Sequence, residues 1–514
     1  MNPPLVDTPE LREVPEVETK LAPATVATTP ARWFAQKFPG LRDEFGDAVL
    51  EVTDEDGVLW ARDIGEDFFA ATLGDKGTPD APTVFLPTEQ RFYTYSQSKG
   101  IFAHQRDPVL LTQLSRLLLE CVRKCRDHCE TRALEFRLRG SNRLSGVLKK
   151  GRGLLEVPPE FFSTGLTEFI PCANGVLRLS DKTLLPFSPA YRRRNKLAVP
   201  YESNAKCELF IDTLMRPALD ADELDLLQRA CGLFLIGENL AQRILLLIGT
   251  AGGGKGTLIR VLQGIIGADN VGALRTHLLY ERFELGRFLG RTLLYGADVP
   301  DNFLNHRGAS ILKSLTGGDP VTLEFKNSNE APGILCKFNV IVTCNSRLTV
   351  HLEGDTGAWR RRLAIVEYRR PQPAKVIVDL SEQILAREAS GVLNWMLEGF
   401  EKIRADGYQL HLTPAQQKLV DDLLLESEGH VVFVRESLAR DPEEQLTVTD
   451  CYAAYVELCN EHGWRALTKN KFGAVIGDTV VHQFGITTRH DIPDSKGKEQ
   501  RGWKGIRLQR NSQE

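Results

Sequence analysis

Short runs of apolar residues in the middle of the chain predict the strands of a buried sheet. The runs cover residues 243–249, 292–297, 338–343 and 363–368, and they lack a regular alternation with polar positions. Such runs are typical of parallel strands that are covered on both faces. A glycine-rich stretch and a helix from about Gly256 follow the first run. This order of strand, glycine loop and helix is the beginning of an α/β nucleotide-binding domain.

Helical patterns flank this region on both sides. Helices are predicted over residues 107–133, 209–237 (two helices), 376–403 and 413–428. Residues 447–508 predict two helices and then two strands, with a turn rich in glycine and lysine between the strands. The domains expected from these patterns are a disordered acidic tail (1–30), an N-terminal α+β domain (31–205), an α/β nucleotide-binding core with lead-in helices (206–372), a helical lid and linker (373–430) and a C-terminal domain of helices and strands (431–514).

Composition and charge exclude several classes of protein. The chain has 514 residues and a formal net charge of −4, which excludes a globally basic nucleic-acid binder but not local basic patches. No apolar stretch approaches 18 residues, so no membrane span and no membrane partner are expected. The first 30 residues have neither the basic start nor the apolar run of a signal peptide. Ten scattered cysteines then favour a reduced, cytoplasmic protein.

The strongest chemical signal is the glycine-rich run itself. A glycine loop lets many backbone amides surround phosphate oxygens, the following helix adds its N-terminal dipole, and a lysine adds a positive charge for the β- and γ-phosphates. The strict motif has Ser or Thr directly after the lysine, where this chain has Gly256. Thr257 therefore either ligates Mg²⁺ from a shifted position or leaves that role to water. The residues expected to bind nucleotide are Gly249, Thr250, Ala251, Gly252, Gly253, Gly254, Lys255, Gly256, Thr257 and Leu258.

Polar residues at the ends of two later strands are candidates for catalysis. Asp298 ends the second strand, 43 residues after Lys255, and Asp301 follows it. A carboxylate beside a phosphate loop can hold Mg²⁺ and polarise a water molecule, so Asp298 is the first candidate and Asp301 the second. Asn345 follows the third strand and can hydrogen-bond a γ-phosphate or the attacking water.

Two further segments carry positive charge in a suggestive context. Residues 321–327 alternate like a hairpin strand after a Gly-Gly-Asp-Pro turn, and Phe325 and Lys326 at the tip suit a base face and a nucleic-acid backbone. A solvated hairpin is the competing interpretation. The arginines of residues 360–362 precede the fourth strand, and in a ring ATPase such an arginine reaches the γ-phosphate of the neighbouring subunit. Surface pairing is the alternative there.

Together these motifs resemble those of superfamily 3 helicases, and most of all the phage/plasmid and pox-virus primase-helicase family. The resemblance rests on residues 249–258, 313–319, Asn345 and 359–363, and the lead-in resembles the family at 174–179 and 226–237. It extends from about Gln90 to the C-terminus. It implies a multidomain α/β protein with an AAA+ P-loop core on a parallel sheet, an N-terminal α+β collar-type domain and a C-terminal winged helix.

The resemblance also implies roles for single residues. Lys255 and Thr257 would bind ATP and Mg²⁺, and Asp298 would be the acidic Walker-B residue and a metal ligand, where relatives often have Glu. Asn345 would be the sensor, and Arg361 or Arg362 the finger supplied to the neighbouring subunit. Lys326 would face DNA in the pore of a homohexameric ring. The implied activity is that of an ATP hydrolase and replicative DNA helicase that translocates on single-stranded DNA.

The C-terminal segment adds a second expected contact with DNA. Its helix-turn-helix pattern and the following wing-like turn predict phosphate contacts from Lys469, Lys471, Arg489, Lys496 and Lys498, and hence a role in binding duplex origin DNA. A protein interface is the alternative. The basic stretches 131–153 and 191–196 either line the entrance of a DNA channel or are ordinary surface.

A primase is not expected within this chain. Residues 31–90 are too few for a polymerase-type domain, and no pair of Cys-x-x-Cys motifs forms a zinc ribbon. A separate primase is therefore an additional expected partner of a phage, plasmid or integrated-element helicase. Two alternatives remain: an initiator or helicase loader that uses ATP only as an assembly switch, and a small-molecule P-loop phosphotransferase.

Overall fold

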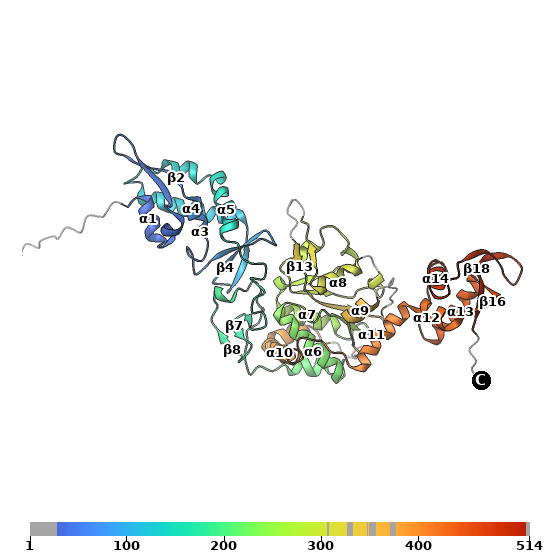
Figure 1. Ribbon diagram of the computed structural model, residues 1–514. Helices are drawn as coiled ribbons and strands as arrows, with labels where there is room; N and C mark the ends of the chain where they lie inside the picture. The colour runs from blue at the N-terminus through green and yellow to red at the C-terminus, as the bar shows by residue number, and fades with distance from the viewer. Residues whose placement is uncertain are drawn as a thin grey trace, which may run out of the picture. The chain divides into compact units, whose positions relative to one another are not determined.

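The computed structural model describes residues 28–305, 308–325, 333–346, 348, 356–370 and 377–509. The chain divides into two compact units (Figure 1). The first unit comprises the chain up to residue 82 together with 105–155, and the second comprises 83–104 together with 156 to the C-terminus. Residues 83–104 and 156–205 thus group with the second unit, which also contains the glycine-rich run. The domain limits expected from the sequence stay predictions.

The first unit is mainly helical around an aromatic core. Phe34, Phe38, Phe68 and Phe69 are buried and meet largely edge to face, at centroid distances of 5.0 to 6.5 Å. Its elements are α1 (Pro30–Lys37), α2 (Leu41–Phe45), β1 (Val49–Thr53), β2 (Leu59–Ile64), α3 (Glu66–Ala71), α4 (Asp107–Cys125), the π-helix η1 (Ala133–Leu138) and α5 (Ser141–Leu154).

The second unit begins with small antiparallel sheets and two lead-in helices. The strands are β3 (Thr83–Leu86), β4 (Arg91–Ser96) and β5 (Ile101–Gln105) in one sheet, and β6 (Phe169–Cys172), β7 (Gly175–Arg178) and β8 (Thr183–Leu185) in another. The π-helix η3 (Phe210–Met215) and α6 (Ala221–Ile236) follow, in agreement with the two helices predicted over 209–237.

A five-stranded parallel sheet forms the centre of the second unit. Its order is β10-β11-β14-β9-β15, and all four strands predicted from apolar runs belong to it. The bounds are β9 (Ile244–Ile248), β10 (Val271–Ala273), β11 (Leu293–Gly296), β14 (Asn339–Cys344) and β15 (Leu363–Glu367). The multidomain α/β class is therefore confirmed, whereas the AAA+ and winged-helix assignments remain proposals.

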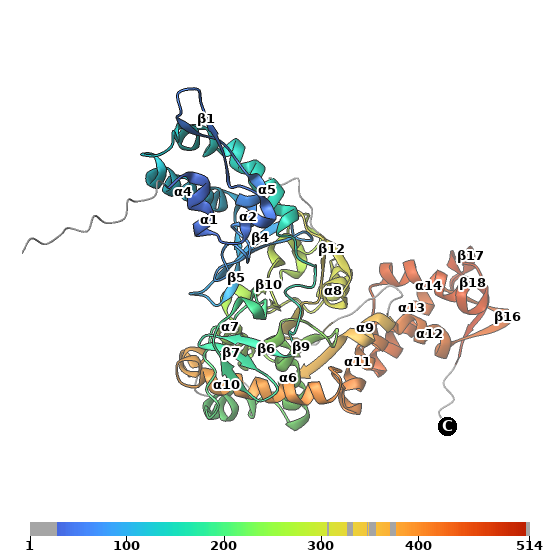
Figure 2. The ribbon, with the colours of Figure 1, turned by 60° about the vertical axis from the view of Figure 1, so that its left-hand side comes forward.

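Alternate residues of the central strand enter two different cores. Leu245 and Leu247 pack into the core that contains α6, α7 (Lys255–Ile266) and α10 (Leu380–Ala405), and Figure 2 shows α10 running beside α6. Ile244 and Leu246 pack into the core that contains α8 (Ala309–Gly317) and α9 (Thr356–Arg362). Helices thus cover both faces, which is why β9 has no polar alternation.

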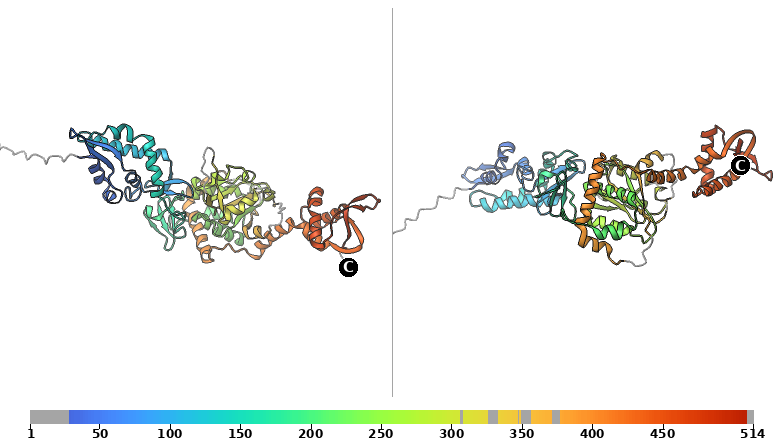
Figure 3. Two further views of the ribbon diagram at one scale, coloured as in Figure 1. Left: turned by 45° about the horizontal axis from the view of Figure 1, so that its top comes forward. Right: turned by 90° about the horizontal axis from the view of Figure 1, so that it is seen from below.

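The last part of the chain combines helices with a three-stranded antiparallel sheet (Figure 3). The capping box of Thr413 and Gln416 begins α11 (Pro414–Ser427), the connecting helix expected from the sequence. The two expected helices and two expected strands are present, and β16 is an additional strand that pairs with β18. The elements are α12 (Gly429–Ser437), β16 (Leu438–Thr447), α13 (Val448–Glu461), α14 (Lys469–Phe484), β17 (Arg489–Pro493) and β18 (Glu499–Leu508).

All ten cysteines are free thiols, and Cys121, Cys125 and Cys129 are buried in the first unit. No three Asp, Glu, His or Cys side chains gather as a metal site within the part of the chain that the structure describes. Among the same residues, no helix is both long and apolar enough to span a bilayer.

Glu223 on α6 makes stability depend on pH. Its side chain is buried, its Oε2 atom has no hydrogen-bond partner among the described residues, and burial together with nearby Asp220 raises its pKa to about 7. The folded state therefore binds a proton that the unfolded state releases above about pH 4.5, so stability falls as pH rises towards 7. We expect Glu223→Gln to raise the melting temperature at pH 8 and to change it little at pH 5, as measured by thermal unfolding at both values.

Candidate nucleotide site

The candidate site lies at the carboxyl ends of β9 and β14. From β9 the chain crosses to β10 at one edge of the sheet, and from β14 it crosses past β9 to β15 at the other edge. Neighbouring strands whose connections leave in opposite directions form a crevice, and ligands of open α/β sheets bind in such crevices. The glycine loop after Ile248 and Asn345 after Cys344 both lie at this point.

The loop geometry requires glycine at its two ends. A Cβ atom on Gly249 would lie 2.0 Å from the carbonyl oxygen of Tyr368, so no larger residue fits there. Gly254 has φ +105°, in a region that favours glycine, and it is the N-cap of α7. Within the part of the chain that the structure describes, no side chain caps this helix, so its first amides remain available to a phosphate.

Lys255 is held at the centre of the loop. Its residue is only 3% exposed, and its Nζ atom donates to the carbonyl oxygens of Gly249 at 2.7 Å and Thr250 at 2.9 Å. Burial lowers the pKa of Lys255 below its ordinary value, and the negative charge of Asp298 opposes that shift. The charge of Asp298 thus acts on Lys255, and the roles of both residues in nucleotide binding stay predictions.

The turn after β11 fixes Asp298 against β14. The Asp298 amide donates to Thr343 Oγ1 at 2.9 Å, and the amide of Val299 donates to the Thr343 carbonyl oxygen at 2.9 Å. Asp298 has φ +47°, an uncommon conformation for a residue other than glycine, and it is exposed. Asp301 is half-buried and forms an ion pair with Arg465 at 3.7 Å. Asp298, in contrast, has no ion-pair partner among the residues that the structure describes.

Asn345 lies next to the start of the loop. The amide of Gly249 donates to the carbonyl oxygen of Cys344 at 3.2 Å, and this bond extends the pairing of β9 with β14 beyond the strands. Asn345 itself is exposed. Lys255, Asp298 and Asn345 therefore belong to one group at the carboxyl ends of the central strands.

Thr257 and Gly256 stand in the first turn of α7. Thr257 is half-buried, and Gly256 is exposed. The nearest atom to a Cβ placed on Gly256 would be Arg260 Nη1 at 3.9 Å, so a serine would fit without displacing a neighbour. Packing therefore does not explain why position 256 lacks a side chain with a hydroxyl group.

The three arginines of α9 lie at the opposite end of the strands, on the amino side of the sheet. Leu363 pairs with Ile244 and Glu367 with Ile248, so α9 ends at the amino end of β9. The five residues of β9 span about 16 Å at roughly 3.3 Å each. Arg361 and Arg362 therefore lie at the opposite end of β9 from the glycine loop.

The surroundings of these arginines differ. Arg360 forms an ion pair with Asp421 at 3.1 Å, and Arg362 is half-buried with a bond from Nη1 to the Ala358 carbonyl oxygen at 3.4 Å. Arg361 is exposed, and the described residues offer it no ion-pair partner. Arg361 is therefore the arginine that is free to act on another molecule.

The hairpin expected after Gly317 exists as β12 (Pro320–Thr322) paired with β13 (Gly333–Leu335). Lys326 lies outside the described residues. Phe325 is half-buried in the connection that follows β12, with the Arg91 guanidinium 5.3 Å from its ring centroid. The contact of Phe325 with DNA stays a prediction.

The expected phosphate-binding lysines of the C-terminal part are all on its surface. Lys469 and Lys471 begin α14, and Lys496 and Lys498 lie in the turn between β17 and β18. Asp494 shapes this turn by accepting the amides of Lys496 and Lys498, each at 2.9 Å. Arg489 pairs with Asp491. In the basic stretch 131–153, four of the seven Lys and Arg side chains form ion pairs: Arg132 with Glu130, Arg143 with Asp63, Lys150 with Asp67 and Arg152 with Asp107.

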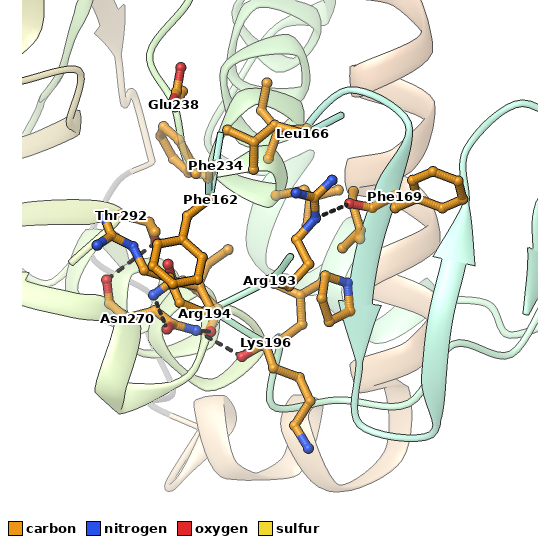
Figure 4. A pocket seen from close by; sticks show the side chains of 18 of the residues that line it. Phe162, Leu166, Phe169, Arg193, Arg194, Lys196, Phe234, Glu238, Asn270 and Thr292 are labelled. Carbon is orange, nitrogen blue, oxygen red and sulfur yellow. Dashed lines mark hydrogen bonds between the residues drawn. The ribbon is translucent and has the colours of Figure 1, made fainter. Parts of the chain in front are cut away.

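A separate cavity is lined by residues of β6, of the segment 193–197 and of α6 (Figure 4). The guanidinium of Arg193 donates hydrogen bonds to the carbonyl oxygens of Phe169, Thr164 and Gly165. Arg194 forms an ion pair with Glu89. The basic run 191–196 therefore ties segments of the second unit together at these two positions, which argues against a DNA channel there.

Sequence reasoning missed the segment 368–370, which follows β15 and packs along the phosphate loop. The amide of Tyr368 donates to the Ile248 carbonyl oxygen at 2.7 Å, and Thr250 Oγ1 donates to the Arg370 carbonyl oxygen at 3.2 Å. No local pattern marks this segment, because it approaches the loop only through the pairing of β15 with β9.

Comparisons with known proteins match two parts of the chain. Residues 117–216 match the family described as "D5 N terminal like", and residues 247–362 match a family of unknown function, DUF5906. No curated protein matches. Structures of the NrS-1 C-terminal region are similar at 10–11% identity with TM-scores of 0.43–0.45, covering 83% of this chain and 96–97% of theirs. The D5 match supports the resemblance to phage primase-helicases that the motifs indicated.

Proposed function

We propose that the chain is an ATP-driven replicative DNA helicase of a phage, plasmid or integrated mobile element. It would be a hexameric ring ATPase of the AAA+ type that moves along single-stranded DNA. One observation carries the proposal: Lys255, Asp298 and Asn345 lie at the carboxyl end of the sheet, while Arg361 lies at the opposite end without an ion-pair partner among the described residues. A site divided in this way requires a second subunit.

The cofactors of this proposal are ATP and Mg²⁺. The loop amides and Lys255 would hold the phosphates, and the carboxylate of Asp298 and the hydroxyl of Thr257 are the oxygen ligands that suit Mg²⁺. When bound, Mg²⁺ would neutralise charge on the phosphates. Asp298 or Asp301 would orient the attacking water, and the exposed Asn345 amide would contact the γ-phosphate or that water.

The proposal is tested by hydrolysis of ATP with and without single-stranded DNA, followed by strand displacement on a forked duplex. DNA-stimulated hydrolysis with strand displacement supports the helicase. Hydrolysis without strand displacement favours the initiator or loader, and hydrolysis that ignores DNA favours the phosphotransferase.

Thr257 is expected to supply the Mg²⁺ hydroxyl from its shifted position. Thr257→Ala should raise the Mg²⁺ concentration needed for half-maximal hydrolysis roughly tenfold, because water must replace a protein ligand. Adding Gly256→Ser to that variant should restore the Mg²⁺ response, since a serine side chain fits there. A Mg²⁺ titration of both proteins checks this, and an unchanged titration curve for Thr257→Ala would assign the role to water.

The turn between β17 and β18 is proposed as the wing of a DNA-binding winged helix. Replacing Lys496 and Lys498 together by alanine should weaken binding to duplex DNA and reduce the slope of log affinity against log salt by about 2, because two phosphate contacts are lost. Fluorescence anisotropy at several salt concentrations measures this slope. Lys418→Ala, which removes an exposed lysine paired with Asp422, is the matched control. An unchanged slope would favour a protein interface.

A further inference from the structure

We propose that Arg370 binds the β-phosphate of the nucleotide held by its own subunit. This inference rests on the proposed nucleotide site but is independent of helicase activity. It assigns a second cation to the site beside Lys255, supplied by the segment that follows β15.

The backbone of this segment is fixed to the phosphate loop along its length. Beyond the two hydrogen bonds already described, a Cβ on Gly253 would lie 3.1 Å from the Arg370 carbonyl oxygen. Tyr368 is buried, and its hydroxyl donates to the Leu214 carbonyl oxygen at 3.2 Å. The position of Arg370 is therefore set by the same contacts that shape the loop.

The guanidinium of Arg370 stands at the beginning of α7. Its Nη1 atom lies 3.7 Å from where a Cβ on Gly254 would be, and Gly254 is the uncapped N-cap of that helix. Amides of such a glycine loop hold the α- and β-phosphates. A half-buried guanidinium at this place is thus within reach of the β-phosphate, which the loop would present next to Gly254.

The charges around Arg370 favour an anion. Its neighbour Arg369 pairs with Asp220 at 3.0 Å and with Glu367 at 2.6 Å, whereas no described residue forms an ion pair with Arg370. Lys255 and the positive end of the α7 dipole lie on the same loop. These positive groups are arranged around one loop, so a bound polyphosphate would be attracted by each of them.

The test compares binding of fluorescent ATP and ADP analogues to wild type, Arg370→Ala, Arg370→Lys and the control Arg369→Ala. We expect the dissociation constants of both nucleotides to rise about tenfold in Arg370→Ala, which corresponds to about 1.4 kcal/mol. Arg370→Lys should recover part of the loss, and Arg369→Ala should bind both as wild type does. Thermal unfolding without nucleotide confirms that each variant is folded.

Two results would overturn the assignment of Arg370: wild-type affinity of folded Arg370→Ala for both nucleotides, or weakened binding of ATP alone. The proposed function fails separately. If wild type binds no nucleotide, the site itself is wrong. If wild type binds nucleotide but shows no DNA-dependent hydrolysis, the helicase is wrong while Arg370 keeps its role.

Discussion

Replacing Lys255 by alanine is expected to abolish ATP hydrolysis and to weaken nucleotide binding. The Nζ atom donates hydrogen bonds to two carbonyl oxygens of the loop. With a polyphosphate bound, the same ammonium group would donate to phosphate oxygens instead. Loss of a preorganised positive charge at a transferring phosphoryl group should slow hydrolysis on the order of a hundredfold or more. Release of inorganic phosphate and nucleotide titration measure the two effects.

The matched control for this variant is Lys337→Ala. Lys337 is another lysine of the second unit, half-exposed and paired with Glu238 at 3.2 Å, and it lies outside the candidate site. It should leave hydrolysis unchanged. Robust hydrolysis by Lys255→Ala would contradict the proposal that the glycine loop is the ATP site.

Replacing Arg361 by alanine is expected to stop hydrolysis while ATP still binds. Arg361 is exposed, lacks an ion pair among the described residues and lies at the edge of the sheet away from its own phosphate loop. A finger supplied by another subunit acts mainly on the transition state, so the rate should fall on the order of a thousandfold. Arg360→Ala loses only an exposed ion pair and should change the rate little.

Mixing the two inactive variants tests whether the site is shared. Where an Arg361→Ala subunit binds ATP next to a Lys255→Ala subunit, the phosphate loop and the arginine are both intact. Mixed rings should therefore recover part of the hydrolysis that neither variant shows alone. If Arg361→Ala instead loses nucleotide binding, its role is structural.

The sequence predicted the sheet better than its surroundings. Apolar runs identified β9, β11, β14 and β15, because burial on both faces leaves no room for polar side chains. β10 was missed, since its three residues, Val-Gly-Ala, carry almost no signal. The helix predicted over 107–133 ends at Cys125, because the backbone of Glu130 pairs with Leu59 and Ala61 of β2. Tertiary pairing overrides the helical pattern there.

The candidate site shows the same limit. Lys255 and its loop follow from a local motif, and Asp298 and Asn345 follow from strand ends. The difference between Arg360, Arg361 and Arg362 is invisible in the sequence, since it depends on Asp421 and on the packing of Arg362 beneath Gly317. Arg370 carries no local signal either, because only the register of β15 against β9 brings it to the loop.

The proposal that the chain forms a DNA-stimulated ring ATPase is tested by two measurements in the same buffer. These are the rate of ATP hydrolysis with and without single-stranded DNA, and the mass of the protein by light scattering. We expect a particle with the mass of a ring, and we expect single-stranded DNA to increase its rate of ATP hydrolysis. A monomer that hydrolyses ATP at the same rate with or without DNA would contradict it.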